Sequence, residues 1–186
     1  MRIVVLPVDA VNRKVLSEIQ SGLSRVFRGS ICALSEDVLP ISVDAYDLSR
    51  RQHVSARLLS DVHAYAEKSD AGVEKVYRTL GVTDVDIYAA GLNFVFGEAE
   101  CPGKAALISL FRLRPEFYGE PADETLFHER ALKEAVHEIG HTLGVRHCGE
   151  PLCVMYFSLH IGMTDRKRLS FCPVCSAIVD RSASRF

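Results

Sequence analysis

The sequence predicts an α/β (α+β) fold, in which a twisted mixed sheet with one antiparallel edge strand carries helices and a small irregular C-terminal lobe. Short β-branched runs alternate with helical patterns in the first half of the chain, which is typical of a largely parallel sheet. Two β-like runs joined by a Pro-Gly turn follow, and they predict the antiparallel edge. The last quarter is rich in Cys, Gly and Pro and shows little regular pattern.

The first half of the chain supplies the parallel strands and two helices. Arg2–Pro7 is a β-branched run that predicts the first strand, and Ser30–Ala33 predicts the second. Between them runs a helical pattern that ends near Gly29. Its apolar positions are Val15, Ile19, Leu23 and Val26. A second amphipathic helix is expected over Val54–Glu67, and the acid-alternating run Asp84–Ala90 is interpreted as a central strand.

The second half begins with the two β-like runs, Asn93–Phe96 and Ala105–Arg112. A long helix then opens at Pro121-Ala122-Asp123 and ends at Gly144, because glycine accepts the left-handed backbone of a helix C-terminus. Its apolar stripe advances by four, three and four residues, at Leu132, Val136, Ile139 and Leu143. A short helix begins near Cys172. We therefore expect one domain over residues 1–186, with a sheet lobe at 1–144 and a C-terminal lobe at 145–186.

Composition excludes several classes of protein. The 186 residues are 48% hydrophobic, with Lys+Arg 22 against Asp+Glu 24 and a net charge of −2. This balance gives no electrostatic reason to expect nucleic acid as a partner. No apolar run approaches the roughly 18 residues that span a bilayer, and the opening segment is too short for a signal peptide. We expect a cytoplasmic protein without nucleic-acid or membrane partners, and its oligomeric state stays open.

The end of the long helix carries the motif His-Glu-x-x-His-x-x-Gly-x-x-His. His137 and His141 lie four residues apart, so both project from one helix face and can hold one ion. Glu138 can reach a water on that ion, and the turn at Gly144 lets His147 return as a third ligand. Three imidazoles leave one tetrahedral position of zinc open, which is typical of a catalytic site. The alternative, solvated histidines on an amphipathic helix, requires a chance match expected about 4 times in 100,000.

Four of the six cysteines form a second cluster near the C-terminus. Two close pairs of thiols separated by a loop are the composition of a closed tetrahedral zinc site. These residues are Cys148, Cys153, Cys172 and Cys175. Disulfides or merely buried thiols are the alternatives. Because His147 and Cys148 are neighbours, a cysteine-bound ion would fix the direction of His147, at a distance on the order of 10 Å from the first ion.

The combined pattern of histidine helix and four cysteines over residues 137–175 resembles the archaemetzincins, a metzincin-clan family of zinc metallopeptidases. The resemblance implies a metzincin-like sheet lobe and a catalytic zinc on the three histidines. It further implies Glu138 as catalytic acid/base, Met155 as the residue of a Met-turn beneath the metal, and a second, structural zinc on the four cysteines. On its own a Met in an apolar dipeptide is usually a core residue, and it is the position of Met155 shortly after the histidine motif that favours the Met-turn.

The expected function is hydrolysis of peptide bonds by a water that zinc activates and from which Glu138, as general base, accepts a proton. A peptide or protein substrate would lie extended along an exposed sheet edge. We assign that edge to Asn93, Phe94, Val95 and Phe96. The alternative is a non-catalytic zinc-stabilised module for protein interaction, with a vestigial open metal site. A carboxylate at position 138 favours the enzyme.

Overall fold

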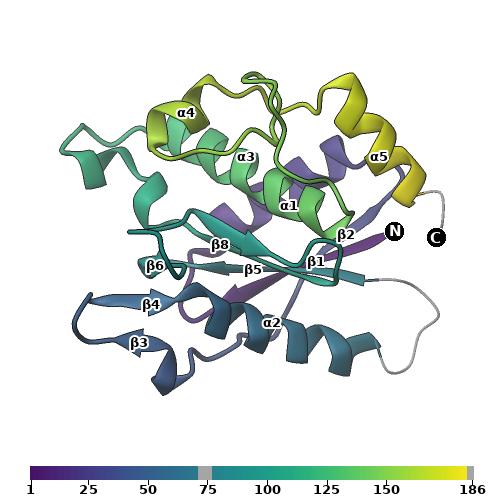
Figure 1. The fold of residues 1–186 in the computed structure, drawn as a ribbon. Helices are drawn as coiled ribbons and strands as arrows, with labels where there is room; N and C mark the ends of the chain where they lie inside the picture. The colour runs from purple at the N-terminus through teal and green to yellow at the C-terminus, as the bar shows by residue number, and fades with distance from the viewer. Residues whose placement is uncertain (71–76, 184–186) are drawn as a thin grey trace.

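The computed structural model describes residues 1–70 and 77–183, and its main sheet is mixed, as expected (Figure 1). Its five strands have the order β2-β1-β5-β8-β7. Four run parallel, and β7 alone pairs antiparallel with its neighbour. These strands are β1 (Arg2–Val8), β2 (Ile31–Leu34), β5 (Tyr77–Thr83), β7 (Gly97–Ala99) and β8 (Ala105–Ser109). The antiparallel strand therefore lies at the sheet edge, which confirms the predicted architecture.

Helices cover both faces of this sheet. Helices α1 (Arg13–Val26) and α3 (Glu124–Thr142) lie on one face, and α2 (Ser55–Asp70) lies on the other (Figure 1). Each side buries its own apolar cluster. A smaller sheet of order β3-β4-β6 flanks α2; its strands are β3 (Tyr46–Asp47), β4 (Gln52–Val54) and β6 (Ile87–Tyr88). Short 3-10 helices cover Val43–Ala45, Phe111–Leu113 and Pro115–Tyr118.

Two strand predictions are wrong. The central strand is β5 rather than Asp84–Ala90, because that acidic segment lies beyond the strand, where Asp86 accepts a bidentate bond from Arg112 (2.6 and 2.7 Å). Within that segment only Ile87–Tyr88 is a strand, and it belongs to the small sheet. The segment Asn93–Phe96 forms no strand and leads instead into β7.

Helix α3 crosses the sheet face, and the His-Glu-x-x-His residues lie at its C-terminal end. Asp123 caps its start by accepting the backbone N–H of Leu126 (2.9 Å). Gly144 follows the helix with φ +86°, the left-handed conformation expected for a terminating glycine. The chain then forms irregular loops, α4 (Ile161–Arg166) and α5 (Pro173–Ala183), and α4 packs beside the middle of α3 (Figure 1).

Candidate active site and second metal centre

The three motif histidines converge. Their ring nitrogens lie within 4.8 Å of one another, and the Nε2 atoms of His137 and His141 are 3.1 Å apart. A tetrahedral zinc with bonds of about 2.0–2.1 Å holds two imidazole nitrogens about 3.3 Å apart. His147 completes the group from beyond Gly144, with its ring centroid 5.4 Å and 4.8 Å from those of the two helix histidines. The trio could hold one zinc ion.

Backbone carbonyls fix the tautomers of the two helix histidines. Nδ1 of His137 bonds to the carbonyl of Val154 (2.8 Å), and Nδ1 of His141 bonds to that of Val145 (2.7 Å). Because a carbonyl only accepts, each Nδ1 carries the proton and each Nε2 presents a lone pair. Two lone pairs facing one another at 3.1 Å repel unless a cation lies between them. The donor set therefore fits a metal ion.

Burial adjusts the charges of these groups. It lowers the pKa of His137 well below the usual value for histidine, and it lowers the pKa of His141 to about 4. Burial lowers the pKa of His147 as well. All three rings are thus neutral near pH 7, which is the form that binds a metal. Burial and the nearby Glu134 carboxylate raise the pKa of Glu138 well above its ordinary value.

Glu138 differs from Glu134, the other buried acid among the described residues, by its lack of partners. It is 4% exposed, and no residue in the described ranges 1–70 and 77–183 forms a hydrogen bond or ion pair with its carboxylate. The edge strand approaches it closely at Gly97, where a Cβ would lie 2.6 Å from Glu138 Oε1. Only glycine fits there, so Gly97 belongs to the site, although it falls outside both β-like runs expected from the sequence.

Met155 lies beneath the histidine helix and is fully buried. A Cβ on Gly140, which lies between the two helix histidines, would be 2.6 Å from the Met155 sulfur. The helix therefore needs glycine at this position if the Met155 turn is to pass under the histidines. The His-Glu-x-x-His spacing leaves position 140 free, so the motif gives no signal for this requirement.

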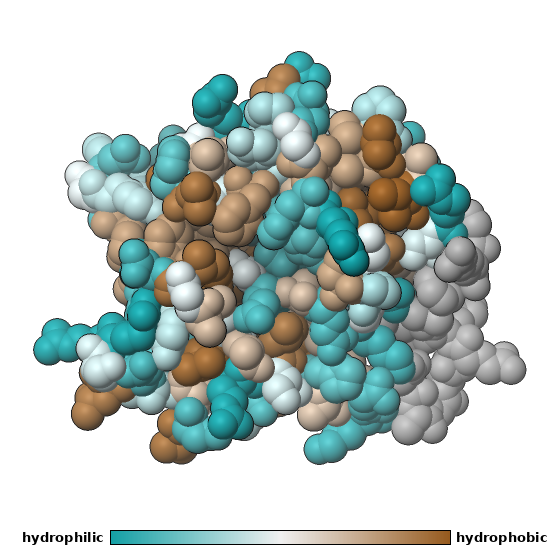
Figure 2. Space-filling model, in the orientation of Figure 1, coloured by the Kyte–Doolittle hydropathy of each residue, from teal (hydrophilic) through white to brown (hydrophobic). Residues whose placement is uncertain are grey.

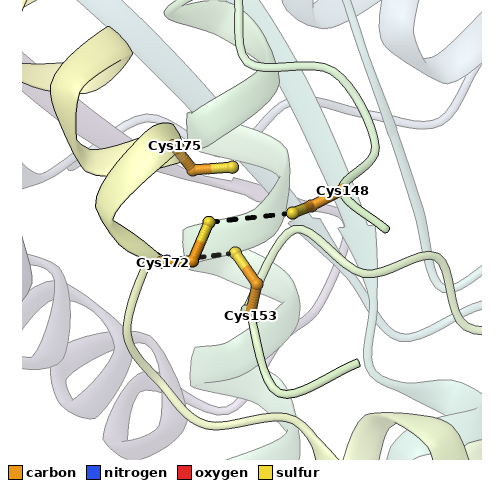
Figure 3. Close-up of side chains that lie close together, drawn as sticks. All are labelled: Cys148, Cys153, Cys172 and Cys175. Carbon is orange, nitrogen blue, oxygen red and sulfur yellow. Dashed lines mark hydrogen bonds between the residues drawn. The ribbon is translucent and has the colours of Figure 1, made fainter. Parts of the chain in front are cut away.

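The four C-terminal cysteines also converge, with all sulfurs within 4.8 Å of one another (Figure 3). Cys148 and Cys172 have sulfurs 3.7 Å apart, close to the roughly 3.8 Å expected for two ligands on a tetrahedral zinc with 2.3 Å bonds. All six cysteines of the chain are free thiols, so the disulfide alternative is wrong in this structure. Bonds from its neighbours lower the pKa of Cys172 to about 7, which favours the thiolate that metals bind.

A cavity of about 860 Å³ opens beside the histidines. One wall is the histidine face of α3, another is the edge of the sheet, and a third is the loop after Met155. All four residues assigned to the substrate edge line it, together with Gly97, Glu98 and Ala99 of β7. Apolar residues gather at the left of the face drawn in Figure 2, below α4 of Figure 1. Cys101 is exposed and also lines the cavity.

The backbone of β7 defines which groups face the cleft. Ser109 N–H bonds to the Phe96 carbonyl (2.8 Å), and Glu100 N–H bonds to the Ala105 carbonyl (3.1 Å). Bonding positions alternate in an antiparallel pair, so the backbone groups of Gly97 and Ala99 point away from β8. The N–H of Val95, by contrast, already bonds to the Ile87 carbonyl (3.1 Å). The available edge is thus β7, directly after the segment that the sequence suggested.

The chain has the features of a protein of the zinc metallopeptidase class. These are a mixed sheet with a histidine-bearing helix, a glutamate in a cleft without a partner among the described residues, and a cluster of four thiols. The family model described as "Peptidase family M54" matches residues 4–181. The chain belongs to this family, the archaemetzincins. An archaemetzincin from Methanocaldococcus jannaschii is 47% identical over 178 residues, covering 94% of this chain and 90% of the relative. One from Pyrococcus furiosus is 42% identical, covering 93% and 89%.

Solved structures agree with this assignment. The crystal structure of an archaemetzincin from Methanopyrus kandleri superposes with a TM-score of 0.81 at 32% identity, covering 100% of this chain and 96% of that one. The archaemetzincin from Archaeoglobus fulgidus, complexed with malonate, gives 0.78 at 38% identity, covering 96% and 99%. The expected family and fold class are confirmed. Separately, the described part of the chain contains no helix with the length and apolar character needed to cross a membrane.

Proposed function

We propose that this chain hydrolyses peptide bonds at a zinc ion held by His137, His141 and His147, with Glu138 as general base. The observation that carries the proposal is the pairing of three converging neutral imidazoles with a carboxylate that has no partner in the described ranges. A structural zinc helix has no use for a buried, unbonded glutamate, because such a group is costly to bury. This argues against the alternative of a non-catalytic interaction module.

In the mechanism, the ion when bound would polarise the scissile carbonyl and acidify water. Glu138 accepts a proton from the attacking water at its carboxylate and delivers it to the departing amine. Burial raises the pKa of Glu138 above its ordinary value, and a more basic carboxylate accepts a proton from water more readily. The Val154 and Val145 carbonyls hold the two helix imidazoles in the ligating tautomer throughout.

We propose that the substrate binds as an extended strand against the cleft-facing edge. The outward backbone groups of Gly97 and Ala99 would pair with its main chain. Asn93, Phe94, Val95 and Phe96 would line the same groove as side-chain and loop contacts. Ala99→Pro removes an outward N–H without removing a bond to β8, so it should raise KM for peptides about tenfold. Unchanged KM would exclude this edge.

The second zinc is proposed on Cys148, Cys153, Cys172 and Cys175, with Met155 as the Met-turn residue under the first. The neighbouring positions of His147 and Cys148 make the cysteine-bound ion a support for the third histidine. We further propose that residues 1–186 form a single catalytic domain, with lobes at 1–144 and 145–186. A reducing compartment such as the cytoplasm would keep the thiols available.

The experiment that tests the function combines metal analysis with a peptide-library digest. The proposal predicts two zinc equivalents per chain and cleavage that Glu138→Gln abolishes while both equivalents stay bound. The interaction-module alternative predicts no cleavage by the wild-type protein under conditions that retain both ions. Cleavage that survives Glu138→Gln unchanged would contradict the mechanism.

A further inference from the structure

Two glutamates lie one helical turn apart on the cleft face of α3, and their surroundings differ. Glu134 and Glu138 both line the cavity beside His137. Glu138 has no partner in the described ranges, whereas Glu134 Oε1 accepts bonds from Lys167 Nζ and from Thr164 Oγ1, each 3.0 Å long. The helix therefore leaves one carboxylate unbonded and ties the other to the C-terminal lobe.

Lys167 is buried to an unusual degree for a lysine. Its side chain is 0% exposed, and that of Glu134 is 4% exposed. Burying two charges is costly, and replacing such a pair by apolar residues is often neutral or stabilising. Overall stability alone therefore does not account for a buried pair at this position. Its place beside the histidine cluster suggests that it contributes to the geometry of that site.

The segment that follows Lys167 leads directly to the histidine site. Arg168 N–H bonds to the Leu152 carbonyl (2.9 Å), and Ser170 O accepts the N–H of Val154 (3.1 Å). The carbonyl of that same Val154 accepts the Nδ1 proton of His137 (2.8 Å). A continuous series of contacts thus links Glu134 on α3 to Lys167 and the Met155 turn, and returns to α3 at His137.

We propose that Lys167 is a positioning residue for the histidine site. Through Glu134 it fixes residues 167–170 against α3, so that the Val154 carbonyl meets His137 in the ligating orientation. The cysteine cluster anchors the other end of this segment, because Cys172 N–H bonds to the Cys153 sulfur (3.3 Å). Lys167 does not line the cavity and acts only through these contacts. The inference rests on the proposed function, since it concerns how that site is held.

Lys167→Met tests the inference in the zinc-loaded protein. Groups that orient a ligating histidine typically change metal affinity 10–100-fold when removed. We expect zinc at the histidine site to bind at least tenfold more weakly, measured by chelator competition, while zinc at the cysteine site is retained. With cobalt in place of zinc at the histidine site, the visible absorption spectrum of Lys167→Met should differ in shape from that of the wild-type protein. For any cleaved peptide, kcat should fall at least tenfold with KM within twofold.

Arg130→Met is the matched control. Arg130 also joins α3 to the α4 region by a buried ionic contact, here to Asp165 (2.7 and 2.8 Å), but it lies two turns before His137. It should leave zinc affinity and kcat within twofold of wild type in folded protein. Equal weakening by both variants, or wild-type zinc affinity in folded Lys167→Met, would overturn the inference.

If Lys167→Met does not fold, the double variant with Glu134→Gln removes both charges and decides the matter. We expect it to fold and still to bind zinc at the histidine site at least tenfold more weakly. If the double variant is stable and binds zinc with wild-type affinity, the Lys167–Glu134 pair has only a structural role. Zinc affinity needs no substrate, so absence of peptide cleavage would refute the proposed function while leaving this test decisive. A wild-type protein that binds no zinc at its histidines would refute both.

Discussion

Gly97 and Glu138 lie so close that a Cβ on the glycine would be 2.6 Å from the Oε1 atom of the glutamate. The same Cβ would lie 2.7 Å from the Leu107 carbonyl oxygen, a backbone atom that cannot move aside alone. The edge strand β7 and the histidine-bearing helix α3 are therefore in contact through a glycine. This contact sets the distance between the proposed base and the strand that would bind a peptide.

Gly97→Ala should therefore impair both the fold and the chemistry. Overpacking of this kind costs about 1–3 kcal/mol of unfolding free energy, and a misplacement of the base by about 1 Å can lower kcat about 100-fold. Denaturant unfolding and peptide cleavage measure the two effects. Gly149→Ala is the control, because a Cβ there meets nothing within 4 Å. A fully active Gly97→Ala protein would show that this contact does not position Glu138.

Glu138→Gln should lower kcat by about 10²–10⁴, the usual contribution of a general base. Zinc content should stay at two per chain, because the glutamate is not needed as a ligand. Glu129→Gln is the control: the exposed Glu129 lies on the same helix and pairs with Lys133 (2.7 Å), and this variant should keep full activity. Loss of zinc from the Glu138 variant would instead indicate a role in holding the metal.

Cys172→Ser should remove the second zinc and so reduce the metal content from two zinc equivalents per chain to one. Structural zinc contributes directly to folding, so we expect a loss of at least about 3 kcal/mol, or about 6–12 °C in Tm. Cys32→Ser is the control, because Cys32 lies outside the cluster and is only half-buried. An unchanged Tm and zinc content would show that the four cysteines hold no ion.

The metal-free protein should lose stability on acidification. The pKa of His141 is about 4 in the folded protein and near 6.5 when unfolded, so the unfolded chain binds more protons between these values. The contribution of His141 to the free energy of unfolding should therefore be fully present above about pH 6.5, fall as the pH drops through this window, and be lost below about 4. Urea titrations from pH 7.5 to 4 measure it, and His141→Gln should flatten the curve.

The sequence predicted that the three histidines converge, because the pattern that brings them together is local. His137 and His141 follow from helix spacing, and Gly144 marks the turn by a conformation that glycine accepts. The ligand orientation was not predictable, since the carbonyls of Val154 and Val145 reach the rings only after the C-terminal lobe folds under α3. Contacts between distant segments leave no periodic signal.

A contact between distant segments also explains why the sequence did not predict the central strand β5. The described β5 contains Gly81, whose missing Cβ would lie 2.6 Å from Val62 on α2. The glycine weakens the β pattern in the sequence, yet it is what lets the helix pack closely on the sheet. Asp84 and Asp86, which suggested alternation, instead bind arginines beyond the strand end.

The most direct test is X-ray diffraction from crystals of the zinc-loaded protein at energies on both sides of the zinc absorption edge. We expect two anomalous peaks per chain. One should lie among the sulfurs of the four cysteines, and the other among His137, His141 and His147 with no fourth protein ligand. Diverging imidazoles, or a protein side chain occupying the fourth position, would contradict the proposed hydrolase and leave a fold held together by metal.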